Sequence, residues 1–299
     1  MELKTVDLGG PLAYADHGGS GAPVVLVHGL AGSSVNWIAV APKLSESFRV
    51  LAPNLAGFGK TPLAGRTATV ETNFELLTRF VETVAGPPAL LVGHSMGGLL
   101  TLQLAATRPD LVGAAVLMSA ASPGKAGGVA PAEQTAMIET LIGGDIVAVA
   151  PIAHATAHSQ GAELLVDNAF AYMHRRPVSK EVRDAHIALE RERGQDPSTT
   201  LAYLQAFKSL YDMRTDFEPF DEAVRAVRAP VLVLHGEEDP VVPIANMRRA
   251  AALRPDWETV WLAGVGHNPQ METPETFLAA VVPFLLRAAQ GSGRAAAAQ

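Results

Sequence analysis

Short apolar runs that end at a glycine or another small residue recur along the chain. The run APVVLVHG at residues 22–29 is the first clear example, and its β-branched character is typical of a strand buried on both faces of a sheet. Similar runs follow at Arg49–Asn54, Pro88–Ser95, Val112–Ser119, Pro230–Gly236 and Thr259–Ala263. Helix-like stretches such as Val70–Val84 and Gly97–Thr107 lie between them. This alternation predicts an α/β fold with a mostly parallel sheet that helices cover on both faces.

Two further strands are expected before these runs, at Leu3–Asp7 and Leu12–His17. The turn residues Gly9-Gly10-Pro11 separate them, which favours an antiparallel hairpin at the edge of the sheet. With this hairpin the predicted sheet has eight strands.

The alternation breaks between about Pro123 and Asp216. Helical patterns occur there at Ala132–Leu141, Ser179–Arg193 and Thr199–Tyr211, without a convincing strand. An all-helical insertion between two parallel strands is expected to sit above the strand ends as a cap. We therefore expect residues 1–122 and 217–290 to form the core, residues 123–216 to form the cap, and residues 291–299 to be a flexible tail.

The composition narrows the choice of partners and compartment. The chain has 299 residues, 48% of them hydrophobic, and a formal net charge of −7 without a basic run, so a nucleic-acid partner is not expected. There is no cysteine, which excludes disulfides and thiolate chemistry. The N-terminus lacks the basic and apolar regions of a secretory signal, and no apolar stretch is long enough to span a membrane. We expect a cytoplasmic protein without a membrane span; the oligomeric state is left open.

The segment Gly93-His94-Ser95-Met96-Gly97 matches the pattern G-x-S-x-G. It follows the apolar run ALLVGH and precedes the helix-like stretch GGLLTLQLAATRP. A strand, a sharp turn and a helix form the setting in which this pattern makes a nucleophile elbow. We therefore expect Ser95 to be a catalytic nucleophile, lifted clear of the sheet edge near a helix N-terminus that favours negative charge.

A serine hydroxyl needs a neighbouring base, and the base needs an acid to orient it. His267 lies in a loop of small residues after the last predicted strand, and Asp239 lies in the turn after the strand before it. Glu237 and Glu238 are rivals of Asp239 because they share its turn. We prefer Asp239, because Pro240 fixes the chain beyond it where the loop turns back toward the sheet edge. The order Ser95, Asp239, His267 is the order expected for a serine hydrolase of this architecture.

The stretches HGLAGSS, GHSMGG, GEEDPVVP and GVGHNPQMETPE resemble the signature segments of the α/β-hydrolase superfamily. The resemblance implies that the backbone N–H groups of Leu30 and Met96 form the oxyanion hole, and that His28 braces the loop that carries Leu30. We expect an apolar pocket between the cap and the sheet edge, with Leu30, Trp37 and Met96 as candidate walls.

Two other motifs are weaker. The segment Asn54–Thr61 ends like a phosphate-binding loop, but Asn54 stands where the first glycine belongs and the segment follows a later strand. His154 and His158 have the spacing of two zinc ligands on a helix, but Ala155 replaces the glutamate of the zinc-binding motif. We expect neither a metal nor a cofactor.

The leading functional prediction is a carboxylesterase, a serine hydrolase that cleaves small to medium hydrophobic esters through an acyl-enzyme. Epoxide hydrolases and haloalkane dehalogenases resemble the sequence but carry aspartate where Ser95 stands, and cofactor-free haloperoxidases usually lack a large cap. C–C bond hydrolases of aromatic degradation keep the serine and are the main alternative. A triad-bearing ligand receptor with slow turnover is the alternative from a different class.

Overall fold

The computed structural model describes residues 2–124 and 132–296 and contains the predicted eight-stranded sheet. The order across the sheet is β1-β2-β4-β3-β5-β6-β7-β8. The strands are β1 (Glu2–Asp7), β2 (Pro11–Gly18), β3 (Pro23–Val27), β4 (Arg49–Pro53), β5 (Ala89–His94), β6 (Val112–Met118), β7 (Val231–Gly236) and β8 (Glu258–Leu262). The first two form the expected edge hairpin, and β2 also pairs antiparallel with β4. The pairs from β4 to β8 are parallel, so the carboxyl ends of these strands meet at one edge.

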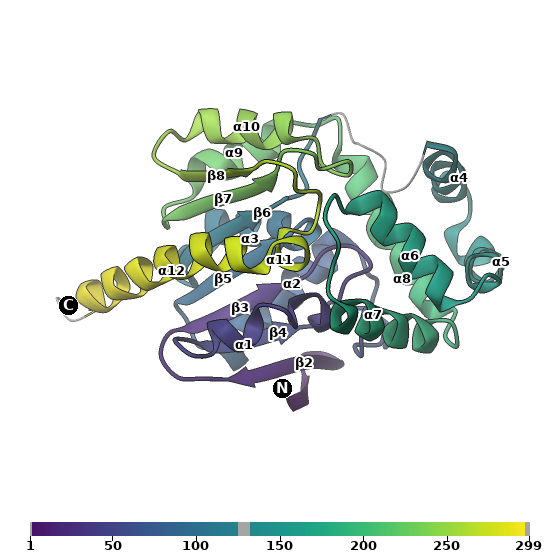
Figure 1. Ribbon diagram of the computed structural model, residues 1–299, viewed down its shortest axis with the longest axis horizontal. Coiled ribbons are helices and arrows are strands. Elements are labelled where there is room, and N and C mark those ends of the chain that lie inside the picture. Colours follow the sequence, from purple (N-terminus) through teal and green to yellow (C-terminus); the bar gives the residue numbers. More distant parts are fainter. Residues whose placement is uncertain (1, 125–131, 297–299) are drawn as a thin grey trace.

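Helices cover both faces of the sheet, as predicted (Figure 1). One face packs against α2 (Val70–Phe80), η2 (Val81–Ala85), α3 (Met96–Thr107), α9 (Glu218–Ala226) and α10 (Ile244–Leu253). The other packs against the 3₁₀ helix η1 (Ser34–Trp37), α1 (Ala41–Leu44) and α12 (Pro274–Ala296), with α11 (Pro269–Glu272) just before α12. In β3, Val25 and Val27 join the first cluster while Val24 and Leu26 join the second. Burial on both faces explains why this strand reads as a continuous apolar run.

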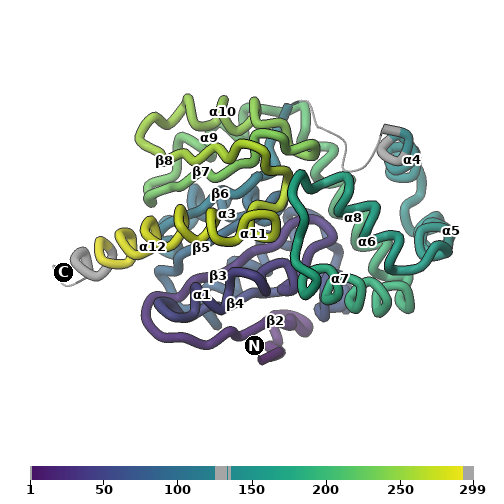
Figure 2. The backbone as a smooth tube through the Cα atoms, in the orientation of Figure 1, coloured from purple at the N-terminus to yellow at the C-terminus, as the bar shows by residue number. Residues whose placement is uncertain are grey.

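In the described part of the chain between β6 and α9, five helices lie together beyond one end of the sheet (Figures 1 and 2). They are α4 (Ala132–Ile142), α5 (Ile146–His158), α6 (Ala162–Met173), α7 (Lys180–Arg193) and α8 (Ser198–Met213), and we refer to them as the cap. Two of these helices have side-chain N-caps: Asp145 accepts backbone hydrogen bonds at the start of α5, and Ser179 does so at the start of α7.

The last helix, α12, continues to Ala296 and so enters the stretch 291–299 that the sequence predicts to be a flexible tail. Residues 297–299, like residues 125–131 in the predicted cap, lie outside the described part of the chain. Among the described residues, no helix combines the length and the apolar character needed to cross a membrane.

The packing of α12 on the sheet predicts that two of its apolar side chains contribute very differently to the stability of the fold. Phe277 is fully buried, whereas Leu286 on the same helix is 38% exposed. Phe277→Ala is expected to lower the free energy of unfolding by about 3–5 kcal/mol, because it leaves a cavity in a packed core. Leu286→Ala is the matched control, and its cost should be well under half of that. Urea titration measures both, and equal losses would contradict the assigned burial.

Candidate active site

Ser95 lies at the sharp junction between β5 and α3, in the setting that the sequence predicts. Its backbone has φ 53° and ψ −119°, a conformation that non-glycine residues rarely adopt. Two neighbouring glycines make the junction possible because no side chain fits at either position. A Cβ at Gly97 would lie 2.2 Å from the carbonyl oxygen of Val27, and one at Gly93 would lie 2.3 Å from the carbonyl oxygen of Gly97.

The loop after β3 runs directly beside Ser95. A Cβ at Gly29 would lie only 2.8 Å from the Cβ of Ser95, so the peptide that carries the Leu30 N–H group lies next to Ser95. His28 braces this loop: its Nδ1 donates to the carbonyl oxygen of Gly29 at 2.7 Å, and its Nε2 accepts from the N–H of Leu55 at 2.9 Å. Burial lowers the pKa of His28 to about 4, which keeps the imidazole neutral near pH 7, as this bonding pattern requires.

Asp239 and His267 form a direct pair. The Nδ1 of His267 donates to Oδ2 of Asp239 at 2.8 Å, and Oδ1 of Asp239 accepts from the N–H groups of Val241 and Val242 at 2.8 and 2.9 Å. Burial alone would raise the pKa of this carboxyl group, but the neighbouring imidazoles of His267 and His235 outweigh burial and hold the pKa well below its usual range. Asp239 is therefore a carboxylate that can orient His267 and stabilise its protonated form.

The two rival carboxylates of the same turn point elsewhere. Glu237 and Glu238 are exposed, whereas Asp239 is 8% exposed. Glu237 pairs with Arg248 on the surface. Of the three acids that the sequence offers in this turn, the structure brings Asp239 to His267.

His94 joins the turn at Ser95 to the loop that carries His267. Its Nε2 donates to the carbonyl oxygen of His267 at 2.9 Å, and the two rings lie 4.7 Å apart between centroids. Burial is the main reason that the pKa of His94 falls to about 3, and the neighbouring His267 lowers it further. A neutral His94 can hold the His267 main chain without placing a second positive charge beside the base.

Glu272 is a further residue of this site, and the sequence analysis did not identify it. Its buried carboxylate accepts four backbone N–H groups: those of Gly266 and Asn268, which flank His267, at 2.9 and 3.1 Å, and those of Arg175 and Arg176, just after α6, at 2.7 and 3.2 Å. The sequence feature that points to Glu272 is its position five residues after His267, on the short helix α11. Glu272 thus ties the loop of His267 to the chain that leaves α6.

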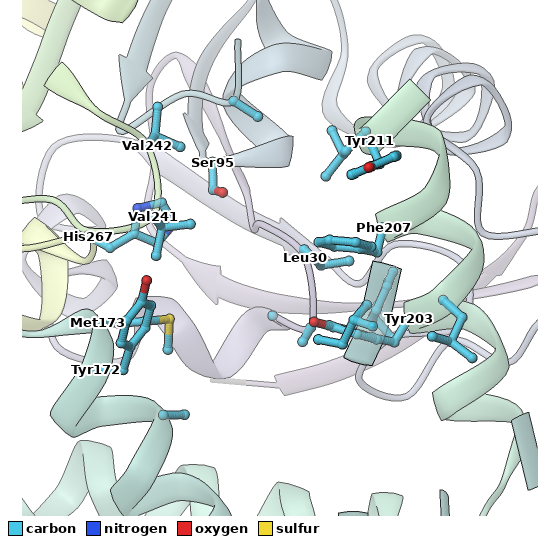
Figure 3. A pocket seen from close by; sticks show the side chains of 18 of the residues that line it. Leu30, Ser95, Tyr172, Met173, Tyr203, Phe207, Tyr211, Val241, Val242 and His267 are labelled. Atoms are coloured by element: carbon cyan, nitrogen blue, oxygen red, sulfur yellow. The ribbon is translucent and has the colours of Figure 1, made fainter. Parts of the chain in front are cut away.

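A large cavity of about 1810 Å³ lies between the cap and the carboxyl ends of the strands. Ser95, His267 and Leu30 line it. Figure 3 shows Ser95 and His267 across the cavity from an aromatic wall on α8. Tyr203, Phe207 and Tyr211 form that wall.

Two of the expected walls do not belong to this cavity. Trp37 and Met96 are fully buried and are absent from its lining. Trp37 packs into the core between the sheet, α1 and α12, and Met96 packs into the core on the opposite face. Both expectations were wrong for the same reason, since closeness to the site in sequence does not decide which way a side chain points.

The two weak motifs have structural roles. Oδ1 of Asn54 accepts the N–H of Ser34 at 2.7 Å and so holds the segment after the β3 loop. On α5, His154 bonds to Thr200 and to the carbonyl oxygen of Gly194, while Nε2 of His158 lies 3.0 Å from Glu190. Within residues 2–124 and 132–296, no cluster of three candidate metal ligands is found.

Residues 22–274 match the family model of the alpha/beta hydrolase fold. The chain belongs to the α/β-hydrolase family. This agrees with the resemblance of its sequence motifs and with the fold described above, and it makes the chain a hydrolase of that family.

Three relatives illustrate the range of this family. The chain is 30% identical to a 2-hydroxy-6-oxo-6-(2'-aminophenyl)hexa-2,4-dienoic acid hydrolase of Metapseudomonas resinovorans, over 96% of this chain and 91% of the relative. It is 28% identical to a pimeloyl-[acyl-carrier protein] methyl ester esterase of Aeromonas hydrophila, over 89% and 96%. The crystal structure of a putative lipase from Acinetobacter baumannii superimposes with a TM-score of 0.77 at 25% identity, over 97% and 92%.

The contrast between buried Asp239 and exposed Glu238 gives a direct test of the acid. Asp239→Asn should lower kcat for an activated ester by roughly 10³–10⁴-fold, because the amide stabilises neither the required tautomer nor the imidazolium of His267. Glu238→Gln is the matched control and should leave kcat within about two-fold. Steady-state kinetics on p-nitrophenyl butyrate measures both. Full activity of Asp239→Asn, or a loss confined to Glu238→Gln, would show that the acid is misassigned.

Proposed function

We propose that the chain is a serine hydrolase that cleaves carboxylic esters of small to medium hydrophobic molecules through an acyl-enzyme. The observation that carries the proposal is the strained Ser95, which lines an apolar cavity together with His267, the imidazole that Asp239 holds from behind. A strained serine beside an oriented imidazole is the arrangement that nucleophilic acyl transfer requires.

The reaction follows from these positions. Oγ of Ser95 attacks the ester carbonyl while Nε2 of His267 takes its proton, and the imidazolium then protonates the departing alcohol. In the second half, His267 takes a proton from water, the hydroxide attacks the acyl-enzyme, and the acid leaves as Ser95 regains its proton. Asp239 stays ionised throughout, in keeping with its lowered pKa.

The tetrahedral intermediate needs two convergent donors for its oxyanion. The N–H of Met96, the first residue of α3, is one, and the N–H of Leu30 is the other. The close approach of Gly29 to Ser95 supports the second assignment. The N-terminus of α3 adds a favourable field for the negative charge.

The cavity wall favours a neutral, hydrophobic ester. Its lining is mainly apolar and aromatic, with Tyr203, Phe207 and Tyr211 facing Ser95. Two arginines line it, and each donates to protein carbonyl groups, Arg193 to those of Ala31 and Gly32 and Arg214 to that of Tyr211. Guanidinium groups occupied in this way are less available to an acidic substrate.

Cleavage of a C–C bond is the second candidate. It is favoured by the similarity to the Metapseudomonas enzyme, whose name describes a hydrolase of a dienoic acid. The same groups would serve this reaction, with Ser95 attacking the ketone and the proton going to a carbon leaving group in place of an alcohol oxygen. The decisive difference lies in the substrate, because a dienoic acid carries a carboxylate that the cavity must accept.

A panel of substrates separates these candidates. We expect the highest kcat/KM for p-nitrophenyl butyrate among acetate, butyrate and octanoate esters, and a kcat/KM at least about 100-fold lower for a 2-hydroxy-6-oxo-dienoate, because this cavity holds little free positive charge. Ser95→Ala is the control for background hydrolysis. A higher kcat/KM for the dienoate would favour the C–C hydrolase, and stoichiometric binding of esters without turnover would favour a receptor.

A further inference from the structure

The loop that carries the proposed oxyanion donor is not held by the core alone. It continues from Gly29 through Leu30 to Ala31, whose φ of 55° lies in the left-handed region. A non-glycine residue keeps such a conformation only where its surroundings enforce it. On the core side, His28 holds the carbonyl oxygen of Gly29. The carbonyl groups of Ala31 and Gly32 face α7 of the cap.

Arg193, the last residue of α7, donates hydrogen bonds to those carbonyl groups. Its Nη1 donates to the carbonyl oxygen of Ala31 at 2.7 Å and its Nη2 to that of Gly32 at 2.9 Å. The Arg193 side chain is only 13% exposed. Hydrogen bonds from a charged donor are roughly twice as strong as neutral ones. Because one planar guanidinium group holds two adjacent carbonyl groups, it fixes the orientation of the two peptides to which they belong.

A second group within the cap holds the guanidinium in place. Oε2 of Glu190, one turn earlier on α7, lies 3.4 Å from Nη1 of Arg193, and Oε1 of Glu190 lies 3.0 Å from Nε2 of His158 on α5. Burial alone lowers the pKa of Arg193, while Glu190 opposes that change. The chain of contacts therefore runs from α5 through Glu190 and Arg193 to the loop beside Ser95.

We propose that Arg193 is a positioning residue that lets the cap hold the oxyanion loop, so that the N–H of Leu30 meets the oxyanion only while α7 is seated on that loop. The inference rests on the proposed serine-hydrolase function. Arg193 itself touches no reacting atom. Its effect passes through the backbone of Ala31 and Gly32, which follow Leu30 directly.

Two substitutions at Arg193 and one elsewhere test the proposal. Arg193→Met keeps the aliphatic stem but removes both donors, and Arg193→Lys retains a charge without the fork. Lys60→Met is the matched control, because Lys60 and Glu192 form another ion pair between core and cap, and both side chains are about half exposed. Circular dichroism and Tm establish that each variant is folded.

Arg193→Met should lower kcat about 10- to 100-fold with KM changed less than about three-fold, since a displaced donor is lost mainly in the transition state. The inhibition constant of a trifluoromethyl ketone, which forms the tetrahedral oxyanion, should rise by the same factor as kcat falls. Arg193→Lys should recover part of both effects. Lys60→Met should leave kcat, KM and the inhibition constant within about two-fold of the wild-type values.

Three results would overturn the proposal. A rise in KM at unchanged kcat would make Arg193 a substrate anchor. If Arg193→Met lowers kcat but leaves the inhibition constant unchanged, the loss of activity does not come from the oxyanion hole. If Lys60→Met lowers kcat as much as Arg193→Met does, the loss reflects docking of the cap in general. Failure of the proposed function is seen separately, in the wild-type protein, as a lack of ester turnover. In that case the variants are compared by the rate at which a p-nitrophenyl phosphonate labels Ser95, because this labelling reaction also needs the oxyanion hole.

Discussion

The backbone at Ser95 is held in a conformation that costs about 1–3 kcal/mol for a residue with a side chain, and much of the site is arranged around that strain. A serine at φ 53° can stand above the sheet edge only because the chain enters and leaves the turn through Gly93 and Gly97, where a Cβ would collide with the neighbouring backbone. The same tight turn brings the loop at Gly29 against Ser95. Ser95, the N-terminus of α3 and the loop at Gly29 thus depend on one local geometry.

His267, the proposed base, depends on a second set of contacts, and these reach into the cap. Glu272 holds both neighbours of His267 and the chain after α6, while the N–H of His267 donates to the carbonyl oxygen of Met173 at 2.9 Å. On the other side, Arg193 holds the loop beside Ser95. The cap is consequently bound to the loops of both His267 and Leu30, so we expect its position to bear on the proposed catalysis as well as on substrate access.

The elements that could be predicted from sequence are those whose signal is local. The buried strands, the hairpin and the elbow around Ser95 each follow from runs of apolar residues and from turn residues within a few positions. Helix α6 was not predicted, because its apolar residues do not form a single stripe: Val166 is buried while Leu164 is 45% exposed.

The parts that could not be predicted depend on contacts between distant positions. Arg193 meets Ala31 across 162 positions of the chain, and Glu272 meets Arg175 across 97. No periodicity encodes such pairings. The orientation of Trp37 depends on distant positions as well, since it joins a buried cluster that includes residues of α12, far along the sequence.

The central claim is that Ser95 is the nucleophile, and covalent labelling tests it most directly. The protein is treated with a p-nitrophenyl phosphonate, and mass spectrometry of the intact chain and its peptides locates the adduct. One phosphonyl group per chain, on the peptide that contains Ser95 and absent from Ser95→Ala, is the predicted result. An adduct on another residue, or one that persists in Ser95→Ala, would contradict the account.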